Sequence, residues 1–310
     1  MIVSFCLIFL ALFFAGCRNN ETPTTKTIRV VGFGDSISAG FAPQNTDLYS
    51  YYNDYISGKT KINAKCYTNI LANSLKTENN KINAISYAES GDTTDDLVNK
   101  LNDIKTYPDL LNDSKKADII TLSIGANNVL GPVLDNMLDY LAGNMSKEEM
   151  TQVLQNGYEN FRDDYTNTII PILTRGNGVV LVMTIYDPYK YFDLTESNIS
   201  GIMADLIDAI NDKFVELKEL AIEYINKIND YIRAQKFDNV FVVDVNNSFE
   251  NLSKEDYVKY LNVNSEELTI QDMSNIQNSV NVDPHPTLEG QEYIGSLFRE
   301  EIKKISNQNA

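Results

Sequence analysis

Five short runs of apolar and β-branched residues recur along the chain, and stretches with helical spacing separate them. The runs cover 28–33, 82–88, 118–124, 179–185 and 240–245, each bounded by turn or polar residues. The helical stretches lie near 67–76, 94–101, 149–173, 202–233 and 288–305. Apolar strands that alternate with helices are typical of a parallel sheet covered on both faces. We therefore expect an α/β protein with a three-layer α/β/α fold on a mostly parallel, five-stranded sheet.

The composition fits one large core. Apolar residues make up 43% of the chain and charged residues 22%, which is ordinary for a globular protein of 310 residues. The formal net charge of -17 argues against nucleic-acid binding, because binding to phosphates needs clustered Lys and Arg. We expect a single domain over 28–310, with a helical elaboration near 135–174 beyond what one crossover between strands needs.

The first 16 residues differ from the rest of the chain. The stretch from Ile2 to Ala15 is almost wholly apolar, and it is short for a membrane span. It ends in Phe14-Ala15-Gly16-Cys17 and then turns polar. We interpret residues 1–16 as a signal peptide and residues 17–27, which are rich in Thr, as a tether to the domain.

The small residues directly before Cys17 resemble the lipobox of bacterial lipoproteins, in which the cysteine becomes the acylated first residue of the mature chain. Phe14 stands where leucine is usual, and no Lys or Arg precedes the apolar run. An ordinary secretory signal or a packed apolar terminus is therefore the alternative. The resemblance implies an exported protein, held at the outer face of the bacterial cell membrane by a lipid anchor at Cys17, or secreted.

Cysteine and histidine are both scarce. Cys6 lies in the expected signal and Cys17 in the expected lipobox, which leaves Cys66 alone in the body of the chain. An intramolecular disulfide is then excluded, and we interpret Cys66 as a small buried apolar residue. With one histidine and one cysteine in the body, we expect no metal site of the usual zinc type.

Polar motifs follow the expected strands at their carboxyl ends, where functional groups gather in open α/β sheets. Ser36 follows the first strand, Gly91 the second and Asn127 the third, while Asp283 and His285 lead into the last helix. Imidazole is the usual base for a serine hydroxyl near neutral pH, so any such mechanism must use His285, the only histidine. Taken alone, a histidine between two prolines is equally well a surface loop residue.

In this order the motifs resemble the SGNH, or GDSL-type, esterase/lipase superfamily. The matching blocks are Gly34-Asp35-Ser36-Ile37-Ser38-Ala39-Gly40, Ser90-Gly91-Asp92-Thr93-Thr94, Gly125-Ala126-Asn127-Asn128 and Asp283-Pro284-His285-Pro286. The run 121–128, with Tyr186-Asp187-Pro188, is especially similar to exported bacterial SGNH esterases. The resemblance implies the flavodoxin-like SGNH hydrolase fold and a serine ester hydrolase that needs no cofactor. It implies Ser36 as nucleophile, His285 as base, and the N–H groups of Ser36 and Gly91 with the Asn127 amide as oxyanion donors.

Two positions depart from the family pattern. Asn128 stands where the third block usually ends in Asp, and Val282 stands where the triad acid is usual, three residues before the histidine. A residue before proline is pushed toward extended geometry, which places the side chains of Asp283 and His285 on the same side. Asp283 can then reach the imidazole and fix its tautomer. The alternative is that a backbone carbonyl orients the ring.

The substrate stays open at this point, because the resemblance covers lipids, short acyl esters and acetylated cell-wall sugars. The four tyrosines of Tyr49–Tyr55 are equally consistent with an aromatic wall for a substrate and with a packed loop. A second function class is a surface-anchored binding lipoprotein on a degenerate hydrolase scaffold. The complete set of Ser36, Gly91, Asn127 and His285 favours the hydrolase.

Overall fold

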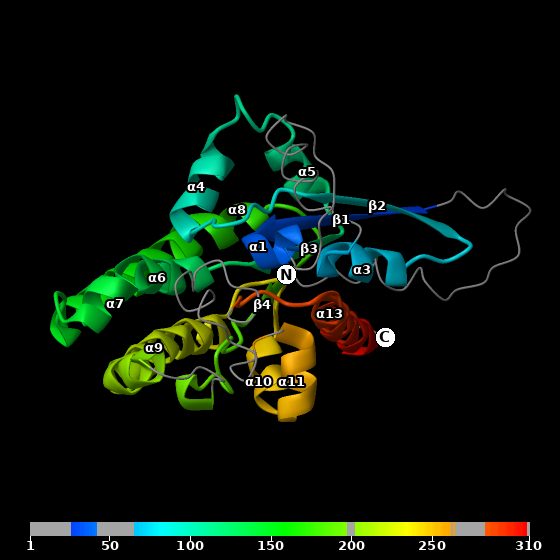
Figure 1. The fold of residues 1–310 in the computed structure, drawn as a ribbon. Coiled ribbons are helices and arrows are strands. Elements are labelled where there is room, and N and C mark those ends of the chain that lie inside the picture. Colours follow the sequence, from blue (N-terminus) through cyan, green and yellow to red (C-terminus); the bar gives the residue numbers. More distant parts are fainter. Residues whose placement is uncertain (1–25, 42–64, 197–201, 262, 264–282, 309–310) are drawn as a thin grey trace, which may run out of the picture.

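A parallel sheet of five strands organises the described part of the chain (Figure 1). The structure, a computed structural model, describes residues 26–41, 65–196, 202–261, 263 and 283–308. The strands are β1 (Lys26–Gly34), β2 (Asn80–Ser86), β3 (Ile119–Ser123), β4 (Val179–Met183) and β5 (Val240–Val243). Their order is β2-β1-β3-β4-β5, and every neighbouring pair is parallel. The expected fold class is confirmed, and each apolar run contributes one strand.

Side chains that alternate along the strands supply two separate cores. Val30 packs into one core and Val31 into the other, and Leu181 and Val182 divide in the same way. One face is covered by α4 (Thr94–Asn102), α5 (Leu110–Lys116), α6 (Ala126–Ala142), α7 (Lys147–Asp164), α8 (Ile170–Leu173) and α9 (Ile202–Ala234). The opposite face is covered by α1 (Ser36–Ala39), α3 (Tyr67–Ser74), α10 (Val245–Glu250), α11 (Lys254–Leu261) and α13 (Leu288–Gln308). Burial of both strand faces explains why the runs are apolar throughout.

The connection from β3 to β4 contains more helix than a crossover requires. Helices α6 and α7 form a helical hairpin. Helix α7 begins with a capping box, in which the side chains of Ser146 and Glu149 each accept a hydrogen bond from the other's backbone N–H. The stretch 149–173, expected as one helix, is interrupted by a π-helical turn at Tyr165–Ile169. Pro171 follows at the start of α8, and because proline has no N–H to donate, the helical hydrogen-bond pattern has to change before it.

The N-terminal predictions lie largely outside the described residues. Residues 1–16, Cys17 and most of the expected tether belong to this part of the chain. Strand β1 begins at Lys26, so the last two residues of the expected tether are part of the sheet. Among the described helices, none combines the length and apolar character that would let it cross a membrane.

Gly157 tests the close packing of α7 on α6. A Cβ at Gly157 would lie 1.9 Å from the carbonyl oxygen of Asn128, whereas a Cβ at Gly131 on α6 would meet nothing within 4 Å. We expect Gly157→Ala to lower the free energy of unfolding by roughly 2 kcal/mol through overpacking. The matched control Gly131→Ala should raise it by up to about 1 kcal/mol through helix propensity. Denaturant unfolding measures both, and equal changes of the same sign would contradict the packing described.

Candidate active site

Ser36 is placed by the close approach of β1 to its parallel neighbour β3, where Gly34 lies opposite Ser123 at the carboxyl edge of the sheet. Gly34 has a φ of 121°, and a Cβ there would lie 1.8 Å from the carbonyl oxygen of Ser123. The Asp35 N–H donates to that same oxygen at 2.9 Å. Only glycine fits such a turn, and the turn delivers Ser36 to the start of α1. Because the strand order reverses between β1 and β3, Ser36 stands at the switch point of the sheet.

The side chain of Asp35 stabilises this turn through two hydrogen bonds. Its side chain is 1% exposed, and Oδ1 accepts from the Ile37 N–H at 3.1 Å and from the Ser123 hydroxyl at 3.0 Å. Burial raises the pKa of Asp35 from 3.8 to about 6, although these hydrogen bonds act in the opposite direction. The carboxyl therefore caps α1 and ties it to the end of β3.

Ser36, His285 and Asp283 form a continuous chain of hydrogen bonds. Ser36 Oγ lies 2.7 Å from His285 Nε2, and His285 Nδ1 lies 2.6 Å from Asp283 Oδ1. The same carboxylate oxygen accepts the backbone N–H of His285 at 2.8 Å. Asp283 thus reaches the ring from two residues away, and this arrangement would let the imidazole take a proton from the serine hydroxyl.

The loop that carries His285 is held by neighbouring elements. The Tyr186 hydroxyl donates to the Pro284 carbonyl at 2.8 Å, and the Phe41 ring lies 4.3 Å from the imidazole between centroids. The Thr287 N–H donates to the carbonyl oxygen of Tyr260 at 2.7 Å. These contacts come from three different parts of the chain, so the orientation of the imidazole depends on the whole fold rather than on its own loop.

Gln291 joins this loop to the serine turn. Its side chain is fully buried on α13, where Oε1 accepts from the Tyr67 N–H at 2.9 Å and Nε2 donates to the Ile37 carbonyl at 3.1 Å. The amide therefore links α13 to α3 and α1. Sequence reasoning missed this residue, because its importance depends on contacts across more than 200 positions.

Gly91 lies on the loop after β2, and Asn127 lies at the start of α6, next to that loop. Gly91 is exposed with a φ of 90°, and a Cβ there would meet nothing within 4 Å. Asn127 stands in the first turn of α6, and its Nδ2 donates to the carbonyl oxygen of Asp92 at 2.9 Å. An amide nitrogen carries two N–H groups, so the second can serve a substrate oxygen. The structure thus ties the Asn127 side chain to the loop of Gly91.

Asn128 fits its place despite the departure from the family pattern. Its Oδ1 accepts from the Thr94 N–H at 3.1 Å, and its Nδ2 donates to the Thr94 hydroxyl at 2.9 Å. An aspartate could accept the first bond but has no N–H for the second. Asn128 therefore fastens the start of α6 to the start of α4, and the missing charge leaves this contact intact.

Ion pairs hold the loop 87–93, which carries Gly91. Lys100 on α4 is 8% exposed, and its Nζ lies 2.7 Å from the Glu89 carboxylate and also contacts the carboxylate of Asp92. Lys100 therefore pairs with residues on both sides of Gly91. Burial raises the pKa of Asp92 to about 7, while Lys100 opposes the rise. Sequence reasoning missed Lys100. The available signal was its helical spacing beside the buried Leu97 and Leu101, a position where lysine is rare unless it is paired.

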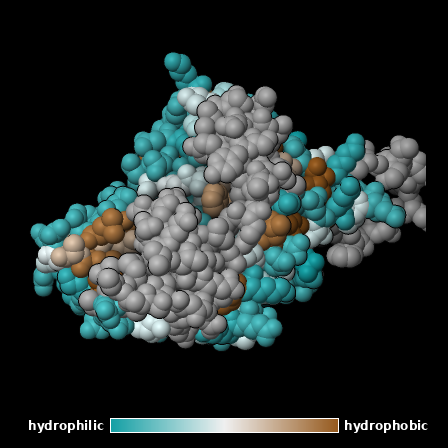
Figure 2. Space-filling view, in the orientation of Figure 1, coloured by the Kyte–Doolittle hydropathy of each residue, from teal (hydrophilic) through white to brown (hydrophobic). Residues whose placement is uncertain are grey.

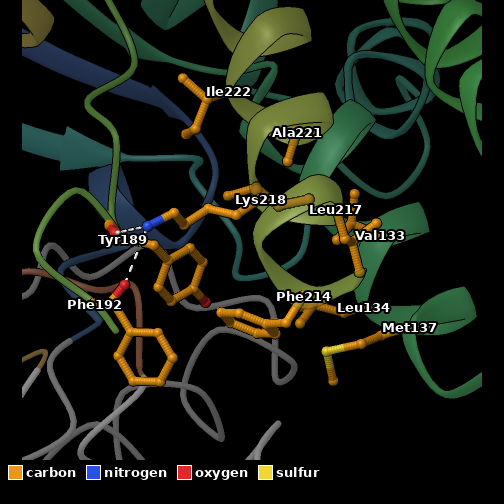
Figure 3. A pocket seen from close by; sticks show the side chains of 11 residues that line it. Val133, Leu134, Met137, Tyr189, Phe192, Phe214, Leu217, Lys218, Ala221 and Ile222 are labelled. Carbon is orange, nitrogen blue, oxygen red and sulfur yellow. Dashed lines mark hydrogen bonds between the residues drawn. The ribbon is translucent and has the colours of Figure 1, made fainter. Parts of the chain in front are cut away.

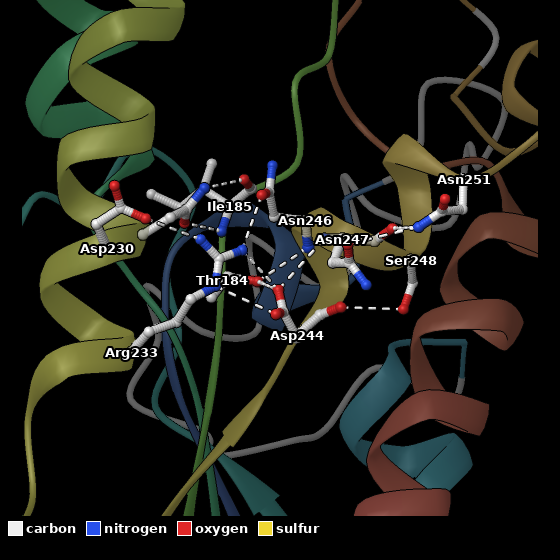
Figure 4. Close-up of polar contacts among 10 residues, drawn as sticks. Thr184, Ile185, Asp230, Arg233, Asp244, Asn246, Asn247, Ser248 and Asn251 are labelled. Atoms are coloured by element: carbon white, nitrogen blue, oxygen red, sulfur yellow. Dashed lines mark hydrogen bonds and ion pairs between the residues drawn. The ribbon is translucent and has the colours of Figure 1, made fainter.

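A second polar network fixes the ends of β4 and β5 (Figure 4). Asp244 accepts from the Thr184 hydroxyl at 3.0 Å and from Arg233 Nη2 at 2.7 Å. The buried Asn229 amide bonds both the N–H and the carbonyl of Ile185, each at 2.7 Å. Because Tyr186 comes next in the chain, this network positions the tyrosine that holds the His285 loop.

Cys66, Cys17 and Tyr49–Tyr55 are the other positions that the sequence singled out. Cys66 is buried, and burial raises its pKa to about 12, which disfavours a thiolate. Within the described ranges, no group of His, Cys, Asp and Glu side chains could hold a metal ion. Cys17 and Tyr49–Tyr55 lie outside the residues that the structure describes.

The raised pKa of Asp35 predicts a pH effect on stability. A carboxyl whose pKa rises on folding contributes stability that is complete below pH 3.8 and is lost as the pH rises through about 6. Asp35→Asn keeps an oxygen acceptor for Ile37 and Ser123 but cannot ionise. As the pH rises from about 4 to about 7, this carboxyl should lower the unfolding free energy of the wild type. The unfolding free energy of Asp35→Asn should fall by roughly 2 kcal/mol less over the same range. Denaturant unfolding across this range measures the slopes, and parallel slopes would refute the assignment.

Comparison with known proteins identifies a family model that matches the chain and solved structures that resemble it. Residues 30–298 match the family model described as GDSL-like Lipase/Acylhydrolase. A lipase from a goat rumen metagenome is 17% identical with a TM-score of 0.55, over 88% of this chain and 97% of that one. An extracellular lipase from Streptomyces rimosus is 18% identical with a TM-score of 0.48, over 88% of this chain and 99% of that one. No curated protein matches the chain. The likeness to the rumen lipase shows a shared fold.

Proposed function

We propose that this chain, which belongs to the GDSL-like lipase/acylhydrolase family and is a hydrolase acting on ester bonds, uses Ser36 as its nucleophile, His285 as its base and Asp283 as the triad acid. The observation that carries the proposal is the chain of contacts from Ser36 Oγ to His285 Nε2 at 2.7 Å and from His285 Nδ1 to Asp283 at 2.6 Å. Every atom needed to activate the serine is within hydrogen-bond reach.

In the first step, Ser36 Oγ attacks the ester carbonyl while His285 Nε2 takes the hydroxyl proton. The carboxylate of Asp283 keeps the Nδ1 proton in place and stabilises the imidazolium. The imidazolium then gives its proton to the leaving alcohol, and an acyl-serine forms. Water, activated by the same imidazole, hydrolyses this acyl-enzyme and restores Ser36. The cycle needs no metal and no cofactor.

Negative charge on the carbonyl oxygen requires donors in fixed positions. We assign the N–H groups of Ser36 and Gly91 and the amide of Asn127 to this role. The positive φ and open surroundings of Gly91 support its assignment, because substrate can approach that backbone. Lys100 supports the assignment further by holding the loop that carries Gly91, and Asn128 by holding the first turn of α6, which carries Asn127. A preorganised donor of this kind lowers the barrier by roughly 3 kcal/mol.

The proposal predicts the effects of changing the base and its partner. We expect His285→Ala to lower kcat on p-nitrophenyl acetate by about 1,000-fold or more, and Asp283→Asn by at least about 100-fold, because the charge that stabilises the imidazolium is lost. Glu289→Gln is the matched control, since it removes an exposed carboxylate four residues after His285. Near wild-type turnover by His285→Ala would reject the mechanism. If His285→Ala loses activity but Asp283→Asn keeps full activity, the catalytic group is a Ser36/His285 dyad and not a triad.

We further propose that the protein is exported and anchored to the bacterial cell membrane through a lipid on Cys17. The sequence Phe14-Ala15-Gly16-Cys17 after an apolar run supports this. Acyl chains anchor a protein by burying about 0.8 kcal/mol per methylene. Cys17→Ser should move the protein from the membrane fraction to the soluble fraction, whereas the control Cys66→Ala should not. Equal membrane association of the wild type and Cys17→Ser would reject the anchor.

A further inference from the structure

The aromatic ring of Phe41 lies against the imidazole of His285. The two ring centroids are 4.3 Å apart, and the ring planes are inclined by 52°. Aromatic pairs usually stand roughly 4.5–7 Å apart, so this is a close contact. Within the described ranges, it is the only contact of His285 with another ring. The reaction steps above give Phe41 no part in the chemistry, although its ring touches the base.

The contact follows from the way helix α1 ends. Gly40 has a φ of 80°, and its N–H donates to the Ile37 carbonyl at 3.1 Å. The N–H of Phe41 donates to the Ser36 carbonyl at 2.9 Å. These two bonds form a Schellman motif, in which an apolar side chain after the left-handed glycine commonly packs back toward the residue that accepts its hydrogen bond. Because that residue is Ser36, the motif brings Phe41 beside the nucleophile and thus beside His285.

The imidazole becomes a cation in both halves of the proposed cycle, because it takes a proton from Ser36 and later from water. Little water surrounds this charge, since the side chains of His285 and Asp283 are 20% and 18% exposed. Asp283 contacts the Nδ1 edge of the ring at 2.6 Å. The buried carboxyl of Asp35 interacts with the imidazole through its charge but is bonded to other groups. Phe41 therefore adds a contact of a different kind.

More distant groups contribute little to the stability of this cation. The face of the molecule in Figure 2 is largely hydrophilic outside the grey atoms, but salt screens exposed charges beyond roughly 8 Å. The apolar cavity between α6 and α9 (Figure 3) includes neither Ser36 nor His285 in its lining. Among its described lining residues, the one charged side chain is Lys218, and its ammonium is bonded to backbone carbonyls. A side chain that touches the imidazole, as Phe41 does, therefore has the larger effect.

The face of an aromatic ring attracts a cation within roughly 6 Å of its centroid, because the ring quadrupole is negative there. We propose that Phe41 acts through His285 in this way: its ring stabilises the imidazolium more than the neutral imidazole and so lowers the barrier. The inference rests on the proposed function, because it takes His285 as the base for Ser36. The attraction strengthens only when the proton reaches Nε2, so Phe41 should raise kcat and leave KM unchanged.

Stepwise fluorination of the Phe41 ring tests this role. Phe41→4-fluorophenylalanine, Phe41→3,5-difluorophenylalanine and Phe41→3,4,5-trifluorophenylalanine withdraw electron density from the ring face in steps, while the ring keeps its shape and apolar character. We expect kcat on p-nitrophenyl acetate to fall at each step, by about fivefold for the trifluoro ring, with KM unchanged. A ring that only fills space would give the same kcat throughout. The same replacements at Phe237, which is also half-buried but packs on Tyr165, are the matched control and should leave kcat unchanged.

The same fluorinated series in the His285→Ala protein separates this inference from the catalytic assignment. With no imidazolium to stabilise, the residual rate should stay constant along the series. If His285→Ala is inactive but kcat of the His285 protein does not change on fluorination, the role of Phe41 is overturned and the proposed mechanism stands. A fall in rate that persists in His285→Ala would also overturn it, because the ring would then act on another group. Near wild-type turnover by His285→Ala would reject the base itself, and this inference with it.

Discussion

The buried amide of Gln291 is the contact on which the geometry of the site depends. It accepts from the Tyr67 backbone and donates to the Ile37 carbonyl, and Ile37 directly follows Ser36. Gln291 itself lies six residues after His285 on the same C-terminal segment. A fully buried amide must have both partners, because an unsatisfied polar group would be costly. The C-terminal helix α13 is thereby joined to α1 and α3, next to the point where Ser36 and His285 meet.

The remaining parts of the site are placed by the carboxyl edge of a parallel sheet. β1, β2 and β3 deliver Ser36, Gly91 and Asn127 to one side, and short polar contacts hold each loop in place. Gly125 shows how closely these loops are packed, since its φ is 109° and a Cβ would lie 2.8 Å from the Phe161 ring. The site is thus built from segments that buried side chains beneath it hold in place. This agrees with a reaction that needs preorganised donors.

The sequence predicted the architecture because periodicity is a local property. Five continuous apolar runs indicated five strands buried on both faces, and proline after Asp283 indicated the extended backbone that brings Asp283 to the imidazole. The π-helical turn before Pro171 was missed, because the sequence shows the proline but not how the helix adjusts. Lys100, Gln291 and the pairing of Asn128 with Thr94 were also missed. Their roles depend on contacts between distant segments, which no pattern in a single sequence records.

The central claim is that His285 activates Ser36, and covalent labelling tests it most directly. A fluorophosphonate reacts with a serine only when a base removes its proton, so it reports activation without requiring the natural substrate. The account predicts one adduct, located on the peptide that contains Ser36 by mass spectrometry, and none in Ser36→Ala. Labelling of His285→Ala should be at least about 100-fold slower. An adduct on another residue, or equal labelling rates for the wild type and His285→Ala, would contradict the account.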